Sequence, residues 1–222
     1  MKFAANPALS PMPFASRKPG SADILYVMAV DNEYGPHLKS RITPLMTGVG
    51  PVEAAMVVTH ALAKLEVEGR PPALVVSLGS AGSQRLEQTE VYQASSVGYR
   101  DMNATAIGFE RGVTPFLGLP AVLELGPFVP GIPRATLSSG ADIVSDFGYA
   151  TIDADMVDME TYAVLRACQR FKVPLVALRG ISDGDKEVAM LHDWTQYLHI
   201  IDEKLAHTVD LLEAAIANGT LE

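Results

Sequence analysis

Residues 73–82 read Ala-Leu-Val-Val-Ser-Leu-Gly-Ser-Ala-Gly, a mostly apolar run that ends in small residues. Two prolines precede it, and a short apolar run without charges is typical of a strand buried on both faces of a sheet. Similar runs occupy residues 24–30, which acidic residues follow, and residues 173–178. The sequence therefore predicts three buried strands, each followed by polar or small residues.

Helical patterns alternate with these strands. One begins at Pro51, a residue suited to the first turn of a helix, and its apolar face consists of Ala55, Val58, Leu62 and Leu65. Another follows Trp194, where apolar residues recur every three or four positions up to Ile216. Between them, residues 91–139 contain short β-prone pieces separated by glycine and proline, at 121–125 and 134–138. This order predicts an α/β layered domain around a mixed sheet.

The composition excludes several classes of protein. The chain has 222 residues, of which 48% are hydrophobic and 19% charged, so it can bury a core and is neither disordered nor collagen-like. Its net charge of −9 argues against nucleic acid as a partner, because nucleic-acid binding needs clustered Lys and Arg. We expect no membrane partner either, since no uncharged apolar run reaches roughly 20 residues. The single cysteine, Cys168, can form no intrachain disulfide, which favours a cytoplasmic protein.

The N-terminal segment has a different character from the rest. The first 22 residues contain three basic residues and no acid, which superficially resembles a targeting leader. Four prolines interrupt the apolar helix that a leader would need, and no cleavage signature follows. We expect residues 1–22 to be a flexible extension and residues 23–222 to form the folded domain.

Polar side chains follow each predicted strand. Asp31, Asn32 and Glu33 follow the first strand, Gly79-Ser80-Ala81-Gly82 the second, and residues 179–183 the third. Ligands of α/β sheets bind just beyond the carboxyl ends of strands, so we expect these three segments to surround one crevice. Taken alone, Asp31 and Glu33 could instead cap the helix that follows them.

Glu160 is a further candidate for the site. The run 157–163 is predicted to open a helix, on which Glu160 shares a face with Val164, Ala167 and Phe171. A carboxylate on an apolar face needs an internal partner or a ligand cavity, because burial of an unpaired charge costs several kcal/mol. The equally weighted alternative is an acid that, with Asp158, stabilises the helix N-terminus.

Other motifs fit known sites poorly. Gly48 and Gly50 resemble the start of a dinucleotide fingerprint, but Glu53 occupies the place of the third glycine, so we predict a tight turn. The histidines show no metal-ligand grouping, and His60 is expected on the surface of its helix. We therefore expect no metal and no cofactor. Ser80 lacks the flanking residues of a nucleophile elbow, which argues against acyl transfer.

Five segments, taken together in order, resemble the motifs of 5′-methylthioadenosine/S-adenosylhomocysteine nucleosidases, which belong to the purine nucleoside phosphorylase superfamily. These segments are residues 29–33, 47–55, 79–82, 157–160 and 179–183. The resemblance extends from residue 24 to about residue 217. It implies a nucleoside phosphorylase-like fold: a single-domain three-layer α/β sandwich around a mixed, partly barrel-like β-sheet.

The resemblance implies hydrolysis of the bond between adenine and ribose, which needs a proton for the departing base and an activated water. By similarity, Asp183 is the general acid on adenine N7 and is held by Ser182. Glu33 activates the water, and Arg179 belongs to the same water site. Burial is expected to raise the pKa of Asp183, so that it can donate a proton at neutral pH.

The resemblance also implies residues that bind the substrate, a small adenine nucleoside. Glu160 corresponds to the carboxylate that binds the ribose hydroxyls, and Met159 packs on the sugar. Ile143 and Val144 resemble the adenine pocket, and Ser80, Ala81 and Gly82 complete the binding segment. The family's habit predicts a homodimer.

Three other functions remain as alternatives. A phosphate-dependent nucleoside phosphorylase is disfavoured because Ser77 stands where phosphorylases carry an arginine, and because the acids at 31–33 would repel phosphate. The others are a nicotinamide dinucleotide-dependent oxidoreductase and a non-catalytic nucleoside-binding module. The short segment 112–138 leaves the 5′ substituent of the nucleoside open, with Phe116 and Phe128 as candidates to close that pocket.

Overall fold

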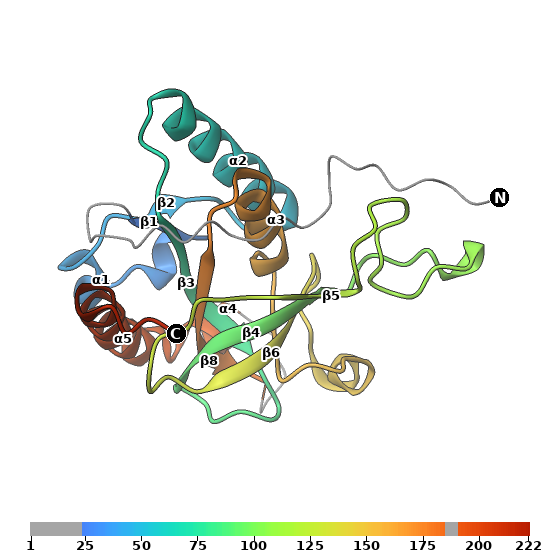
Figure 1. Ribbon diagram of the computed structural model, residues 1–222. Coiled ribbons are helices and arrows are strands. Elements are labelled where there is room, and N and C mark those ends of the chain that lie inside the picture. The colour runs from blue at the N-terminus through green and yellow to red at the C-terminus, as the bar shows by residue number, and fades with distance from the viewer. Residues whose placement is uncertain (1–23, 185–190) are drawn as a thin grey trace.

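The computed structural model describes residues 24–184 and 191–222, so the predicted extension at 1–22 lies outside the described residues. The described strands form one mixed sheet (Figure 1). They are β1 (Ile24–Met28), β2 (Leu45–Met46), β3 (Leu74–Gly82), β4 (Val91–Tyr99), β5 (Val122–Glu124), β6 (Arg134–Ser139), β7 (Met156–Asp158) and β8 (Leu175–Asp183).

Part of the sheet closes on itself. β3 runs parallel to β1 and β8, and β8 pairs antiparallel with β4. β4 then pairs with β6, β6 with β7, and β7 returns to β3 through the pair Gly82 and Val157. The prediction of a mixed, partly barrel-like sheet is confirmed.

Helices cover both faces of the sheet, which confirms the three-layer arrangement (Figure 1). On one face lie α2 (Pro51–Val67) and α3 (Thr161–Phe171), and on the other α1 (Pro36–Lys39) and α5 (Leu198–Asn218). The remaining elements are the short helix α4 (Leu191–Thr195) and the 3₁₀ turns η3 (Asp31–Glu33), η4 (Thr105–Ile107) and η5 (Asp146–Thr151). The predicted helix start at Pro51 and the predicted terminal helix are both confirmed.

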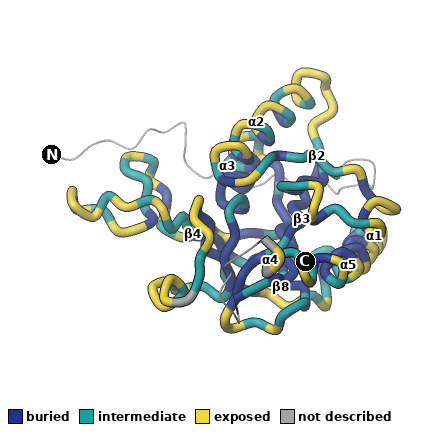
Figure 2. Tube along the Cα trace, turned by 180° about the vertical axis from the view of Figure 1, so that it is seen from behind, coloured by how far each residue is buried: buried dark blue, intermediate teal, exposed yellow. Residues whose placement is uncertain are grey.

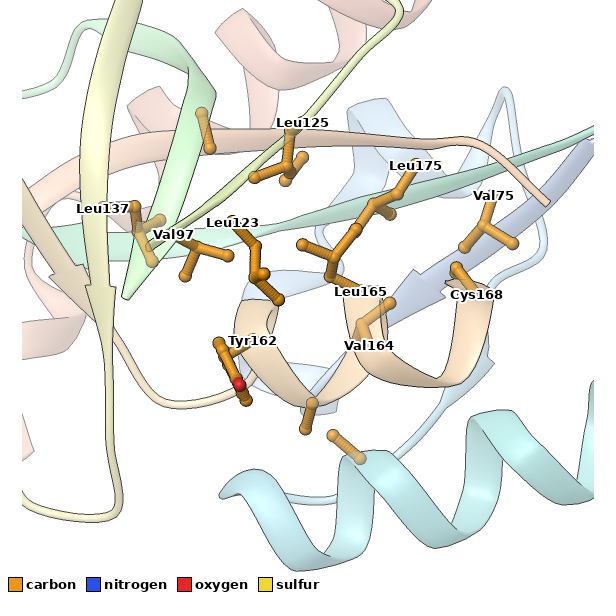
Figure 3. Close-up of a cluster of buried hydrophobic side chains, with 14 of the residues drawn as sticks. Val75, Val97, Leu123, Leu125, Leu137, Tyr162, Val164, Leu165, Cys168 and Leu175 are labelled. Carbon is orange, nitrogen blue, oxygen red and sulfur yellow. The ribbon is translucent and has the colours of Figure 1, made fainter. Parts of the chain in front are cut away.

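Two apolar clusters hold the layers together, and the buried residues follow the strands and the inner faces of the helices (Figure 2). Figure 3 shows the first cluster, where Val164, Leu165 and Cys168 of α3 pack against strand residues such as Val75 and Leu175. The second cluster lies under α5, whose Ile201, Leu205, Val209 and Leu212 are buried. His60 is exposed, as predicted.

Three predicted boundaries are wrong. Residues 79–82 and 179–183 lie within β3 and β8 rather than beyond them, because the two strands pair from Val75 and Leu175 onwards to Gly82 and Asp183. Small residues are needed in these parts of the strands because neighbouring side chains pack closely against the backbone. A Cβ on Gly180, for example, would lie 2.4 Å from the Ile201 side chain. Similarly, residues 156–158 form β7, and α3 starts only at Thr161.

Candidate active site

Glu33 follows β1 directly, in the 3₁₀ turn η3, and its side chain is buried. Its Oε1 accepts hydrogen bonds from the backbone N–H of Ser80, at 2.8 Å, and from the Ser80 hydroxyl, at 2.5 Å. Burial raises the pKa of the Glu33 carboxyl, against the lowering effect of these hydrogen bonds and of the Arg179 charge. Asp31 is exposed, so the structure separates the two acids and Glu33 is the one that faces the sheet.

Arg179 forms a buried ion pair with Asp158, whose Oδ2 lies 3.0 Å from Nη2 and 3.1 Å from Nε. The other N–H groups of the guanidinium donate to Ser77, Thr161 and the carbonyl of Leu178. Asp158 also accepts from Thr161 and from the Ser139 hydroxyl. A guanidinium has five N–H donors, so those of Arg179 are engaged within the protein.

Glu160 lies at the N-cap position of α3. Its Oε1 accepts a hydrogen bond of 2.8 Å from the backbone N–H of Gly50, within the predicted tight turn where Gly48 and Gly50 have φ of 82° and 95°. Burial first, and then the Asp158 charge, raise the pKa of Glu160 to about 7. Glu160 is therefore both paired internally and, as shown next, exposed to a cavity.

A cavity of about 10 Å³, roughly the room that one water molecule needs, joins these groups. Glu33, Ser80, Glu160 and Arg179 all line it, which confirms that the three strand-associated segments surround one crevice. The other lining residues are Val27, Met28, Ala29, Thr47, Ser77, Leu78, Gly79 and Val164. Among the described lining residues, Arg179 is the only cation, and it shares the cavity with the carboxylates of Glu33 and Glu160.

Asp183 is the last residue of β8 and does not line this cavity. Its Oδ1 accepts a hydrogen bond from the Ser182 hydroxyl, and its Oδ2 lies 2.9 Å from the position a Cβ on Gly82 would take. Burial raises the pKa of the Asp183 carboxyl. Glu33 contacts β3 at Gly79, three residues earlier, so the two acids reach β3 at points roughly 10 Å apart.

The remaining residues that were predicted to bind the substrate do not line the cavity. Met159 is half-buried in the bend between β7 and α3, and Ala81 is buried in the first apolar cluster. Ile143 is 69% exposed, and neither it nor Val144 lines the cavity. Phe116 packs edge-on against Phe109, Phe128 lies under the Arg134 guanidinium, and neither phenylalanine lines the cavity.

Some residues around the site escaped the sequence analysis. Trp194 donates from Nε1 to the Ser80 hydroxyl at 2.9 Å, and the hydroxyl of Tyr149 lies so close to Gly82 that a Cβ there would clash with it. Arg100 holds the chain before Ile143 by donating to the carbonyl groups of Ser138, Gly140, Asp142 and Asp158. The sequence held one sign of the buried hydrogen bonds around Arg179, namely a serine within the apolar run 73–78. This serine is Ser77, whose hydroxyl accepts a hydrogen bond from Arg179.

Comparison with known proteins identifies the family. Residues 138–216 match the family model of the phosphorylase superfamily. The 5′-methylthioadenosine/S-adenosylhomocysteine nucleosidase of Haemophilus influenzae (strain PittEE) is 32% identical over 158 residues, which cover 63% of this chain and 67% of that protein. The chain belongs to the 5′-methylthioadenosine/S-adenosylhomocysteine nucleosidase family. Nucleosidases of this family are N-ribosyl hydrolases, so the chain is an enzyme of that class.

Solved structures of nucleosidases share the fold. The Neisseria meningitidis 5′-methylthioadenosine/S-adenosylhomocysteine nucleosidase, in complex with methylthio-immucillin-A, matches with a TM-score of 0.72 at 19% identity, covering 86% of this chain and 98% of that one. Futalosine hydrolase of Helicobacter pylori matches with a TM-score of 0.71 at 19% identity, covering 88% and 97%. The nucleoside phosphorylase-like fold predicted for this nucleosidase is thereby confirmed.

Two kinds of feature are absent from the described residues. Within 24–184 and 191–222, no helix has both the length and the apolar character needed to cross a membrane. In the same part of the chain, no group of three or more His, Cys, Asp or Glu side chains is arranged to hold a metal ion.

Proposed function

We propose that this nucleosidase hydrolyses the N-glycosidic bond of adenine nucleosides of the 5′-methylthioadenosine/S-adenosylhomocysteine type, releasing adenine and a 5-substituted ribose. The observation that carries the proposal is the pair Glu33, buried, and Glu160, half-buried, whose carboxylates line a cavity the size of about one water, while a third acid, Asp183 at the end of β8, approaches β3 at Gly82. The curated relatives named for this activity support the choice of substrate class.

Glu33 is the residue that activates the water. Ser80 holds its Oε1, and the raised pKa brings the carboxylate nearer to the basicity that proton abstraction at neutral pH requires. Arg179 is held in place by its ion pair with Asp158, and its positive charge favours the ionised form of Glu33. Arg179 thus acts through Glu33 rather than through a free N–H group.

Asp183 is the general acid on adenine N7. Its carboxyl stays protonated to higher pH than an exposed aspartate because burial raises its pKa, and Ser182 orients it. Glu33 and Asp183 reach β3 at points roughly 10 Å apart along the strand. Such a separation leaves room for the sugar and a water between acid and base.

The other predicted residues bind the nucleoside. Glu160 accepts hydrogen bonds from the ribose hydroxyls, while Gly50 keeps the carboxylate in place. Met159 packs on the sugar, and Ile143 and Val144 meet the adenine, which requires the exposed Ile143 to move inward on binding. These roles come from the family resemblance, and the cavity position of Glu160 supports the first of them.

Hydrolysis is favoured over phosphorolysis by the charges at the cavity. A phosphate dianion needs free cationic donors, but the N–H groups of Arg179 are engaged by Asp158, Ser77, Thr161 and Leu178. Two carboxylates at the same cavity would repel the dianion. Gly50, whose N–H would bind a pyrophosphate in a dinucleotide site, already donates to Glu160, which disfavours the oxidoreductase.

The test is adenine release from purified protein, first in phosphate-free buffer and then with phosphate. The substrates are 5′-methylthioadenosine, S-adenosylhomocysteine, 5′-deoxyadenosine and aminofutalosine, because the 5′ substituent is open. We expect equal release in both buffers from at least one of them. Release that depends on phosphate would make the enzyme a phosphorylase, and no release from any of the four would overturn the proposal.

Asp183→Asn tests the acid. We expect retained nucleoside binding with a loss of turnover of roughly 10²–10⁴-fold, the usual contribution of a general acid. In the unaltered enzyme, turnover should fall as the pH rises through the pKa of Asp183, because the proton is then lost. Asp153→Asn, at an exposed position, is the control and should leave turnover unchanged. Full turnover in Asp183→Asn would remove Asp183 from this role.

A further inference from the structure

Trp194 is the single tryptophan of the chain, and it reaches the water-activating carboxylate through one intermediate group. It lies on α4, half-buried, and its Nε1 donates to the Ser80 hydroxyl at 2.9 Å. That hydroxyl lies 2.5 Å from Oε1 of Glu33. The three side chains therefore form a continuous hydrogen-bonded series.

The chemistry of the indole fixes the direction of this series. The indole N–H can only donate, so the Ser80 oxygen must accept from Trp194. A hydroxyl has one proton, and Glu33 is then the acceptor that remains for it at Oε1. The backbone N–H of Ser80 donates to the same oxygen, so both hydrogen bonds described for Glu33 end on Oε1 and leave Oε2 for the water.

We propose that Trp194 is a positioning residue for Glu33, which locks the Ser80 hydroxyl into the rotamer that donates to the carboxylate. The inference rests on the proposed role of Glu33 as the residue that activates water. Without the indole donor, the Ser80 hydroxyl is free to rotate away, and Glu33 loses part of the stabilisation of its ionised form.

The other charged groups that face Glu33 would remain in place when Trp194 is changed. They are Arg179 from β8, Asp158 from β7 and Glu160 at the start of α3. Arg179 favours the ionised form of Glu33, and the two acids oppose it. A change at Trp194 therefore alters the titration of Glu33 through Ser80 alone.

The kinetic test uses Trp194→Phe, which keeps an aromatic ring and removes the donor. The acidic limb of the pH profile of kcat/KM, which reports ionisation of the free enzyme, should move to higher pH by about one unit. Ser80→Ala should move it at least as far, and the double variant should match Ser80→Ala. A purely structural role would lower kcat without moving the limb, and additive shifts in the double variant would also overturn the proposal.

The second test needs neither substrate nor a folded Trp194→Phe variant. The fluorescence emission of Trp194 in the unaltered protein should change with pH, and the change should disappear in Glu33→Gln and in Ser80→Ala. Emission that is independent of pH in the unaltered protein would overturn the proposal. So would a pH dependence that persists in both variants. If emission titrates as expected while no nucleoside yields adenine, the proposed function fails and the hydrogen-bonded series stands.

Discussion

The half-buried carboxyl group of Glu160 makes folding stability depend on pH. Its pKa is raised to about 7, first by burial and then by the Asp158 charge. Between the ordinary value of 4.5 and about 7, the folded protein keeps a proton that the unfolded chain has released. The stability that this group contributes is therefore fully present below pH 4.5 and is lost as the pH rises through about 7.

Glu160→Gln should remove this part of the pH dependence, which amounts to at most about 3 kcal/mol across the window. Urea unfolding at several pH values between the two pKa values measures it. Glu53→Gln, at an exposed position on α2, should keep the slope of the unaltered protein. If the slope of Glu160→Gln also stayed the same, the carboxyl would not be titrating as the structure implies.

Tyr149 presents a buried hydroxyl that, among the described residues, lacks a hydrogen-bond partner. Tyr149→Phe removes this unsatisfied group, so we expect the free energy of unfolding to stay the same or to rise by up to about 1 kcal/mol. Tyr26→Phe is the matched control, because the Tyr26 hydroxyl donates to Glu213 at 2.9 Å, and its loss should cost about 1 kcal/mol. Denaturant unfolding of both variants gives the comparison, and a destabilised Tyr149→Phe would mean that the hydroxyl has a partner.

The sequence predicted which residues form the site better than it predicted the ion pairs and hydrogen bonds that hold them in place. Glu33, Ser80, Arg179 and Glu160 come together at the cavity as expected. The pairing of Arg179 with Asp158 could not be predicted, because it depends on how β8 lies against β7 and the start of α3, which no local pattern encodes. Trp194 was missed for the same reason, since a lone tryptophan ordinarily indicates a core position.

Asp202 of α5 joins the terminal helix to the element that follows Glu33. Its carboxylate accepts hydrogen bonds from the backbone N–H groups of His37, at 2.9 Å, and Leu38, at 3.0 Å, and so caps α1. The side chain is buried, and a Cβ on Gly35 would lie only 2.5 Å from it. This contact fixes the short helix α1 and, with it, the turn that carries Glu33.

Asp202→Ala should lower the free energy of unfolding by about 2–3 kcal/mol, because two helix N–H groups lose their buried acceptor. The control is Asp210→Ala, which breaks the partly exposed pair with Arg41 between the same two segments and should change stability little. Chemical denaturation of both variants decides the matter. Equal effects would mean that burial of the Asp202 contact is unimportant.

The lengths of the central strands were underestimated for a physical reason. Gly79, Ser80 and Gly82 have low strand propensity, so the pattern placed the end of the strand at Leu78. In the folded protein β8 pairs alongside β3 up to Gly82, and tertiary pairing overrides local propensity. The missing side chains make room for Glu33 at Gly79 and for Asp183 at Gly82.

The parallel arrangement of β1, β3 and β8 explains why acids distant in the sequence meet. Their carboxyl ends point the same way, so the turn after β1 and the last residues of β3 and β8 reach one edge of the sheet (Figure 1). The alternation of strands and helices predicted this much from sequence alone. The loops that carry Ile143 and Phe116 lie outside that framework, and their positions followed from no pattern.

One face of α2 exposes an apolar stripe, which bears on the predicted homodimer. On the helix, Val52 is 67% exposed and Met56 57%, and their spacing of four places them on one side; Val49, just before the helix, is 52% exposed. Exposed apolar patches of this kind mark protein interfaces. The stripe starts beside Gly50, which holds Glu160, so a second copy of the chain on this face would also steady the site.

Met56→Glu should convert the expected dimer into a monomer, because a charge at the centre of an apolar interface is desolvated without a partner. Ile107→Glu is the control, since Ile107 is 69% exposed and lies in η4, outside this helix, so this variant should remain dimeric. Sedimentation equilibrium measures the mass of each protein. A monomeric unaltered chain would refute the homodimer, whereas a dimer that survives Met56→Glu would place the interface on another face.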